Sequence, residues 1–175
     1  MGQSKGMKLA LTLVLALSNL ANPAATASEP MVLPISGLLF TDVINQYQAP
    51  LIPYGVGHRG IDLPAVIGTA VLSPVSGEIS FSGQVGYRDS ITIKFGGSMW
   101  ASIEPVCSDL AEGTLVSEGE PIGTVCQSNP NYQWHCAISC IHFGTRTDAG
   151  YFSPLALVGG LPESRLVPLG NQALG

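Results

Sequence analysis

The stretch "GEISFSGQVGYRDSITIKFGGSMWASIEPV", residues 77–106, decides the fold class of this chain. It contains three short runs rich in β-branched and aromatic residues, at 77–83, 89–95 and 99–106, and glycine-containing turns separate them. Runs of this length between turn signals are typical of antiparallel strands. We therefore predict an all-β fold, a compact antiparallel β-sheet or barrel-like core.

The pattern continues on both sides of this stretch. Further strand candidates are "TAVLSPV" (69–75), "PIGTVC" (121–126) and "CIHFGTR" (140–146). Only 40–47 and 153–158 show a weak helical period. The sequence contains no internal repeat and no low-complexity segment.

The N-terminus has the composition of a secretory signal peptide. Lys5 and Lys8 precede the apolar run 9–21, and "ATAS" follows at 25–28. We predict cleavage after Ala27, because the apolar run is shorter than the ~20 residues of a spanning helix. The first cysteine is Cys107, so a lipid-anchored precursor is not expected. We expect a secreted or cell-wall-associated protein with no membrane segment after cleavage.

The remaining chain has the length of one domain. We predict a signal peptide at 1–27, a proline-containing extended lead-in at 28–53, a β domain at 54–160 and a loose tail at 161–175. Residues 1–27 hold two of the seven Lys and Arg and none of the twelve Asp and Glu, so the mature chain has a net charge of −7. Such a charge gives no electrostatic reason to bind nucleic acid or an anionic surface.

Four cysteines lie in the mature part, and an even number in an exported chain indicates disulfides. Three pairings are possible. We favour Cys107–Cys126 with Cys136–Cys140, because the last two residues are close enough in sequence to close a small loop.

The histidines are the candidates for chemistry, and the chain has three: His58, His135 and His142. His58 begins "HRGID", which places Asp62 four residues later. On an ideal strand these two residues share a face about 13 Å apart, and we expect a bend or bulge at Gly60 to bring them together. Imidazole and carboxylate are both zinc ligands. The alternative is that Asp62 caps a turn.

Four blocks of the sequence carry a resemblance to a known family. They are "YGVGHRGIDLPAVIGTAVLSPVSGEISFSG", "SEGEPIGTV", "CIHFG" and "YFSPLALV", in this order and across about residues 54–158. The chain resembles the lysostaphin/LytM-type zinc endopeptidases, which cut peptide cross-links of bacterial peptidoglycan. It is most similar to an actinobacterial-looking branch that reads H-R-G-V-D-L and C-L-H-W-G.

The resemblance implies a zinc ion held by His58, Asp62 and His142, in a LytM-type β core with a duplicated hybrid motif. It also implies peptidoglycan peptides as partners. Three protein ligands leave the fourth zinc position open for water, as a catalytic zinc needs. The sequence does not determine the oligomeric state or the bond cleaved.

Two catalytic histidines of the family are missing. The first histidine of the H-x-H motif is Cys140 here, and the second corresponds to Pro105 or to Ser102, depending on whether Ile103 or Trp100 replaces the family tyrosine. None of these is a base, and each lost acid–base group costs about 10²–10⁴ in rate. We therefore assign no catalytic residue.

Three compensations are open. His135 or Glu104 acts as a replacement base, or a reduced Cys140 is a fourth zinc ligand that closes the site. Arg59 is a candidate for orienting Asp62 or a substrate carboxylate. The aromatic candidates for lining a groove are Trp100, Tyr132 and Trp134.

Two functions therefore compete. One is a zinc metalloendopeptidase acting on peptidoglycan with slow or unusual chemistry. The other is a non-catalytic homologue that binds cell-wall peptides or regulates a partner hydrolase.

Overall fold

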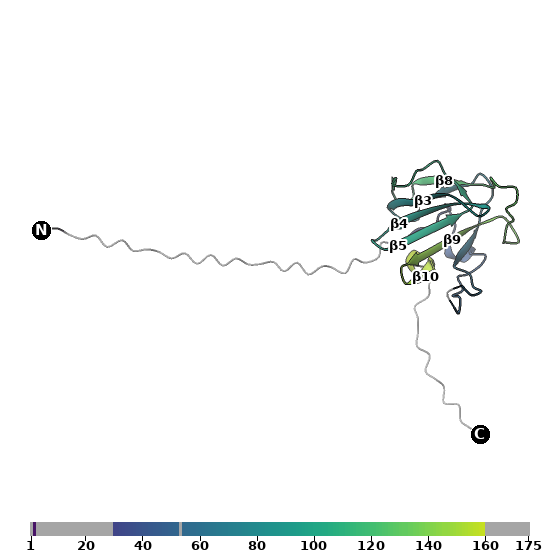
Figure 1. The fold of residues 1–175 in the computed structure, drawn as a ribbon, viewed down its shortest axis with the longest axis horizontal. Helices are drawn as coiled ribbons and strands as arrows, with labels where there is room; N and C mark the ends of the chain where they lie inside the picture. The colour runs from purple at the N-terminus through teal and green to yellow at the C-terminus, as the bar shows by residue number, and fades with distance from the viewer. Residues whose placement is uncertain (1, 3–29, 53, 160–175) are drawn as a thin grey trace, which may run out of the picture.

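Antiparallel strands in two sheets form the body of the protein. In the computed structural model, the residues described are 2, 30–52 and 54–159. The larger sheet has the strand order β1 (Gly60–Pro64), β9 (Cys140–Thr147), β5 (Met99–Glu104), β4 (Arg88–Phe95), β3 (Gly77–Val85) and β7 (Leu115–Val116), and β10 (Gly150–Phe152) pairs with β9. The smaller sheet is β2 (Ala70–Leu72), β8 (Pro121–Val125) and β6 (Val106–Cys107). Figure 1 shows β3, β4, β5 and β9 side by side.

The all-β prediction is confirmed, and most predicted runs are strands. The run 99–106 divides at Pro105 into β5 and β6, which belong to different sheets. Proline has no backbone N–H to donate, so a ladder ends at this residue easily. The two segments with a weak helical period contain only one short turn each, the 3₁₀ turn η1 (Phe40–Asp42) and the helix α1 (Leu155–Val158).

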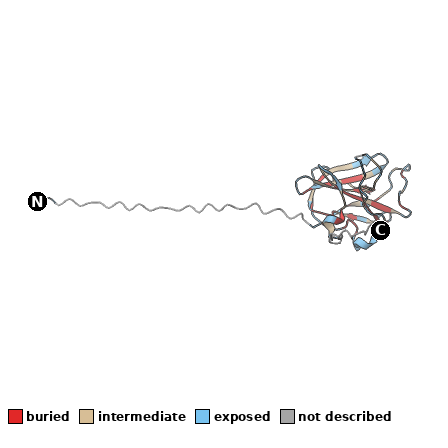
Figure 2. Ribbon diagram, turned by 90° about the horizontal axis from the view of Figure 1, so that it is seen from below, coloured by how far each residue is buried: buried red, intermediate tan, exposed pale blue. Residues whose placement is uncertain are grey.

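Side chains alternate between the core and one open face of the larger sheet. Ile91 and Ile93 of β4, Ile103 of β5, and Ile141 and Phe143 of β9 are fully buried. Burying one such side chain contributes about 1.5–3 kcal/mol to folding. Figure 2 shows buried residues as red segments within the strands of the ribbon. Since successive residues point to opposite faces, the even-numbered neighbours in each strand face outward over β4, β5 and β9.

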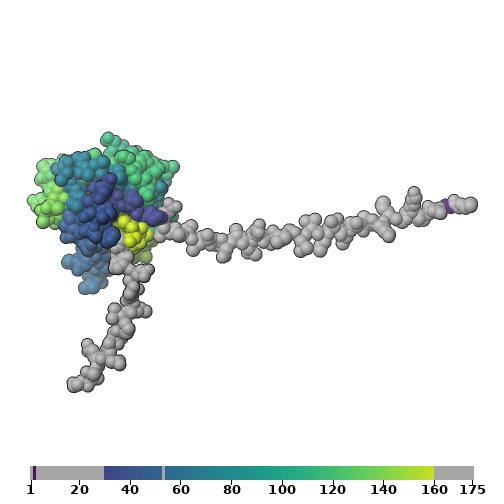
Figure 3. Space-filling model, turned by 180° about the vertical axis from the view of Figure 1, so that it is seen from behind, coloured from purple at the N-terminus to yellow at the C-terminus, as the bar shows by residue number. Residues whose placement is uncertain are grey.

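The lead-in segment packs on the domain. Met31, Leu33 and Ile35 are buried in the core. The backbone N–H of Met31 donates to the carbonyl of Leu157 in α1, and Figure 3 shows the purple-blue lead-in next to the yellow C-terminal part. Within 30–52 the chain forms no strand, but Asn45 and Gln48 make single antiparallel bridges to the β1 region. The lead-in therefore contributes backbone and side chains to the neighbourhood of β1.

Both favoured disulfides are confirmed. Cys107–Cys126 joins β6 to the end of β8, and Cys136–Cys140 ties the loop before β9 to the first residue of that strand. The predicted signal peptide 1–27, apart from Gly2, and the predicted tail 161–175 lie outside the described residues. No helix within the described part of the chain is both long and apolar enough to cross a membrane.

Candidate metal centre

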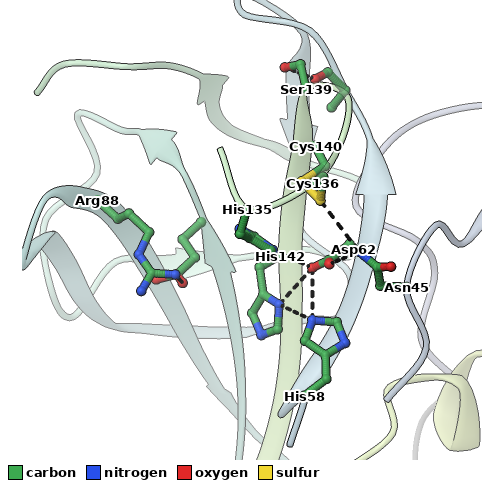
Figure 4. The surroundings of a disulfide bond; sticks show 11 residues. Asn45, His58, Asp62, Arg88, His135, Cys136, Ser139, Cys140 and His142 are labelled. Carbon is green, nitrogen blue, oxygen red and sulfur yellow. Dashed lines mark hydrogen bonds and ion pairs between the residues drawn. A yellow bond between two sulfur atoms is a disulfide. The ribbon is translucent and has the colours of Figure 1, made fainter. Parts of the chain in front are cut away.

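Three side-chain atoms converge at one end of the open sheet face. His58 Nε2 lies 3.1 Å from Asp62 Oδ1 and 3.0 Å from His142 Nδ1, and His142 Nδ1 lies 2.9 Å from Asp62 Oδ1. Figure 4 shows the three side chains pointing toward one another from β1, β9 and the segment before β1. The structure thus brings together the three residues that the sequence motifs named as zinc ligands.

Strand register explains half of this convergence. β1 pairs with β9 so that Asp62 is directly opposite His142, although the two residues are 80 positions apart in sequence. His58 lies outside β1, and the backbone bridge to Gln48 fixes its position. The sequence predicted a bend at Gly60, and the chain bends one residue earlier, at Arg59. This bend turns the His58 side chain toward Asp62.

Gly60 has a different role from the predicted bulge. Pairing of β1 with β9 is regular from this residue onward. A Cβ atom at position 60 would lie 2.3 Å from the carbonyl oxygen of Phe143 and 2.7 Å from Nε2 of His142. Glycine is therefore required because the neighbouring strand and the His142 ring approach so closely.

Asp62 is fully buried, at 0% exposure, in contact with polar groups. Its Oδ2 accepts a hydrogen bond of 2.8 Å from the Asn45 amide. Burial by itself raises the pKa of this carboxyl, but hydrogen bonds from His135, His142 and Asn45 outweigh it and hold the pKa well below its usual range. Asp62 is thus an anion at neutral pH, as a metal ligand must be.

Two groups that contact His58 and Asp62 from outside the triangle were not predicted from the sequence. Asn45 bonds the carboxylate, and the backbone carbonyl of Gln46 lies 2.8 Å from His58 Nδ1. The latter contact fixes the His58 ring with Nε2 toward Asp62 and Nδ1 away from it. Outer partners of this kind orient metal ligands. Nothing in the motif H-x-x-x-D signals them, because they come from the lead-in.

The triangle of donor atoms fits a small cation. Hydrogen bonds cannot satisfy all three contacts at once, because two imidazole nitrogens and one carboxylate oxygen face the same point. A tetrahedral zinc with bonds of 2.0–2.1 Å has ligand-to-ligand edges of about 3.3 Å. The observed edges of 2.9–3.1 Å are a few tenths of an ångström shorter, so the ligands need only a small outward shift.

His135 lies at the same site. Its Nε2 is 3.0 Å from Asp62 Oδ1, and its ring is farther from the other imidazoles than they are from each other, with centroid distances of 6.0 and 6.4 Å against 4.8 Å. The hydrogen bond to Asp62 raises the pKa of His135, although burial acts in the opposite direction. Of the compensations considered from sequence, His135 is the side chain that the structure brings to Asp62.

The other residues considered at the missing catalytic positions do not supply a free base or ligand to the site. Cys140 is bonded to Cys136, so it is not a free thiolate ligand. Glu104 forms an ion pair with Arg88, although it lies opposite His142 in the sheet. Ser102 lines the open face and exchanges a 2.9 Å hydrogen bond with Thr92, whereas Pro105 is buried. Of the two residues that the resemblance places at the second family histidine, Ser102 is therefore the one that faces the groove.

A groove of about 720 Å³ extends from the triangle across β4, β5 and β9. Trp100 and Arg59 line it, as considered from the sequence. Tyr132 and Trp134 do not line it; their rings contact each other edge to face at 5.2 Å. Tyr132 is buried and helps to anchor the loop that carries His135.

Comparison with known proteins decides the family. The pattern of peptidase family M23 matches residues 56–154, more than half of the chain, and this range includes His58, Asp62, His135 and His142. The chain belongs to peptidase family M23. The lysostaphin/LytM-type resemblance of the sequence motifs is thereby confirmed.

The M23 chain also has a sequence relative in mycobacteria. The "Uncharacterized protein Rv2891" of Mycobacterium tuberculosis is 31% identical over 134 residues, which are 74% of this chain and 52% of that protein. The chain thus spans about half the length of the curated relatives it matches.

Two solved structures share the M23 fold. A zinc containing peptidase from Vibrio cholerae has a TM-score of 0.57 at 14% identity, over 73% of this chain and 40% of that one. The catalytic domain of lysostaphin from Staphylococcus simulans has a TM-score of 0.52 at 21% identity, over 66% of this chain and 89% of that one. At these identities the likeness concerns the fold alone.

Proposed function

We propose that this M23 protein is an exported zinc metallopeptidase that cleaves peptides of bacterial peptidoglycan. The observation that carries the proposal is the triangle of His58 Nε2, Asp62 Oδ1 and His142 Nδ1 at the end of an open groove. The family match and the zinc containing peptidase from Vibrio cholerae support it. Peptidoglycan as the substrate comes from the resemblance to lysostaphin/LytM-type enzymes.

In this proposal His58, Asp62 and His142 hold the zinc, which supplies Lewis-acid polarisation of the peptide carbonyl. His135 moves the proton. In the structure Nε2 donates to Asp62 Oδ1, so it must first leave this hydrogen bond and lose its proton. The free nitrogen, at the groove, then accepts a proton from the attacking water and passes it to the amine that leaves when the peptide bond breaks. Water is thus added across the bond, and the products are a carboxylate and an amine.

The second candidate function is peptide binding without cleavage. The disulfide at Cys140 and the hydroxyl of Ser102 favour it, because neither group is a base at the two positions where the related peptidases have histidine. This candidate needs only the groove. It assigns no role to the converging histidines and Asp62.

The direct test uses the mature, disulfide-intact protein. We expect elemental analysis to find about one zinc per chain, and incubation with purified peptidoglycan to release new amino groups. A chelator should stop this release, and added zinc should restore it. Zinc without any release would support the binding candidate, and absence of zinc under metal-replete conditions would exclude the peptidase.

The Cys136–Cys140 disulfide gives a separate prediction, because it holds the loop that carries His135. Replacing both cysteines by alanine should lower the cleavage rate roughly 10-fold to 100-fold, since small misplacements of a catalytic group are that costly. Rates are measured under conditions where the parent protein and the double-alanine variant are both folded. The four-residue separation predicts a stability loss of only about 2 kcal/mol.

The matched control is the other disulfide. Cys107 and Cys126 are 19 residues apart, and removing this bond should cost more stability, about 3 kcal/mol, while leaving the rate nearly unchanged. Equal rate losses in the two double variants would show that general destabilisation, and not the position of His135, controls the rate.

A further inference from the structure

Positive charge is concentrated in the groove of an otherwise acidic protein. The described residues include four Lys and Arg side chains, and three of them line the groove: Arg59, Arg88 and Arg146. Of the ten Asp and Glu side chains in the same residues, Glu104 alone is part of the lining. A positively charged groove attracts anionic ligands, even when the rest of the protein is acidic.

The three arginines are not equivalent. Arg88 is paired with Glu104, so its charge is largely offset. Arg146 lies over the Trp100 ring, with its guanidinium carbon 4.2 Å from the ring centroid, and within the described chain it pairs with no carboxylate. Stacking holds the planar guanidinium in place and leaves its N–H edge for a ligand. Arg59 donates a hydrogen bond to the Gly55 carbonyl and lies 5.8 Å from the Tyr151 ring centroid, a looser ring contact. Arg146 is therefore the groove cation best prepared to bind a carboxylate.

The floor between Arg146 and the metal centre suits an extended backbone. His142, Gly144 and Arg146 point from the same face of β9, and the strand rise places the first and last about 13 Å apart, or about four extended residues. Gly144 has no side chain, and across β5 and β4 its neighbours are the small side chains of Ser102 and Thr92. No bulky side chain of this row interrupts the path.

We infer that the groove binds an extended peptide with a side-chain or terminal carboxylate on Arg146, a few residues from the metal centre. The carboxylate accepts two N–H hydrogen bonds from the guanidinium stacked on Trp100. The inference rests on the proposed function only for the location of the bond to be cut. Binding itself depends on Arg146 and the groove, with or without cleavage.

The experiment measures binding of end-capped hexapeptides to the zinc-supplemented protein by fluorescence polarisation. Each peptide has one glutamate at a different position in a Gly/Ala chain, and each has a glutamine counterpart. At one or two positions we expect the glutamate peptide to bind about tenfold more tightly, as a charged hydrogen bond is worth. The preference should shrink at high salt.

Variants test the assignment to Arg146. Arg146→Gln should remove the glutamate preference, so that each glutamate peptide binds this variant no more tightly than its glutamine counterpart. Lys94→Gln is the matched control, because it removes the one described cation that lies outside the groove. This control should keep the preference.

The outcomes separate this inference from the proposed function. Glutamate-specific binding without cleavage would uphold the carboxylate site and count against the peptidase. Cleavage without a glutamate preference, or a preference that survives Arg146→Gln, would overturn the carboxylate site. Failure of every glutamate peptide to bind better than its counterpart would overturn it as well.

Discussion

The variant His142→Ala should contain no zinc after purification and should release no amino groups from peptidoglycan. His142 supplies one of three donor atoms within 3.1 Å of each other, and a site with two remaining protein ligands holds zinc weakly. Elemental analysis and the cleavage assay measure both effects. Because the variant also leaves the buried Asp62 with one partner fewer, its thermal unfolding is recorded in parallel.

Thr147→Ala provides the control for this variant. Thr147 is on the same strand, β9, and does not line the groove, so its zinc content and activity should match the parent. Full zinc occupancy in folded His142→Ala would contradict the ligand assignment. Asp62→Asn keeps the shape of the side chain but removes its charge, and it should lose zinc in the same way.

The variant His135→Ala should keep about one zinc per chain but lose about 10²–10⁴ in cleavage rate, the usual contribution of a general base. His58, Asp62, His135 and His142 all place a ligand atom within 4.8 Å of one another. However, the ring centroid of His135 is 6.0 and 6.4 Å from those of the other two imidazoles, and its Nε2 contacts the proposed ligand Asp62. We therefore expect zinc to stay on the other three residues. We expect the loss in kcat, with KM nearly unchanged, and partial rescue by free imidazole. Steady-state kinetics on a defined peptidoglycan fragment measure these quantities.

Gln133→Ala is the control in the same loop, since Gln133 is exposed and does not line the groove. Two results would contradict the role of His135. Loss of zinc in His135→Ala would make it a fourth ligand in a closed structural site. An unchanged rate would leave zinc polarisation as the whole of the catalysis.

The disulfide of Cys140 connects this strand residue to the loop that carries His135. The resemblance to the lysostaphin/LytM-type enzymes implies that Cys140 stands where those enzymes have a histidine. In the structure, the sulfur of Cys140 is bonded to Cys136, and the residue before Cys136 is His135. The same strand position thus holds, through its disulfide, the loop that brings a histidine to Asp62.

The sequence was sufficient for several parts of this result. Short β-branched runs separated by glycine turns predicted an all-β fold, because β-branched and aromatic residues favour strands and glycine permits the tight turns between them. Spacing of the cysteines favoured the correct disulfides. The motifs around His58, Asp62 and His142 identified the family and the residues that converge, since these motifs are local in sequence.

Tertiary structure alone decided which distant groups join the site. His135 is 73 residues from Asp62 and 7 from His142, on a loop whose path no motif encodes. Asn45 and the Gln46 carbonyl reach the site from the lead-in, and strand parity selects Ser102 over Pro105. The arginines of the groove come from three separate segments of the chain. Such contacts depend on strand register and loop closure, which the whole fold sets and which no short stretch of sequence specifies.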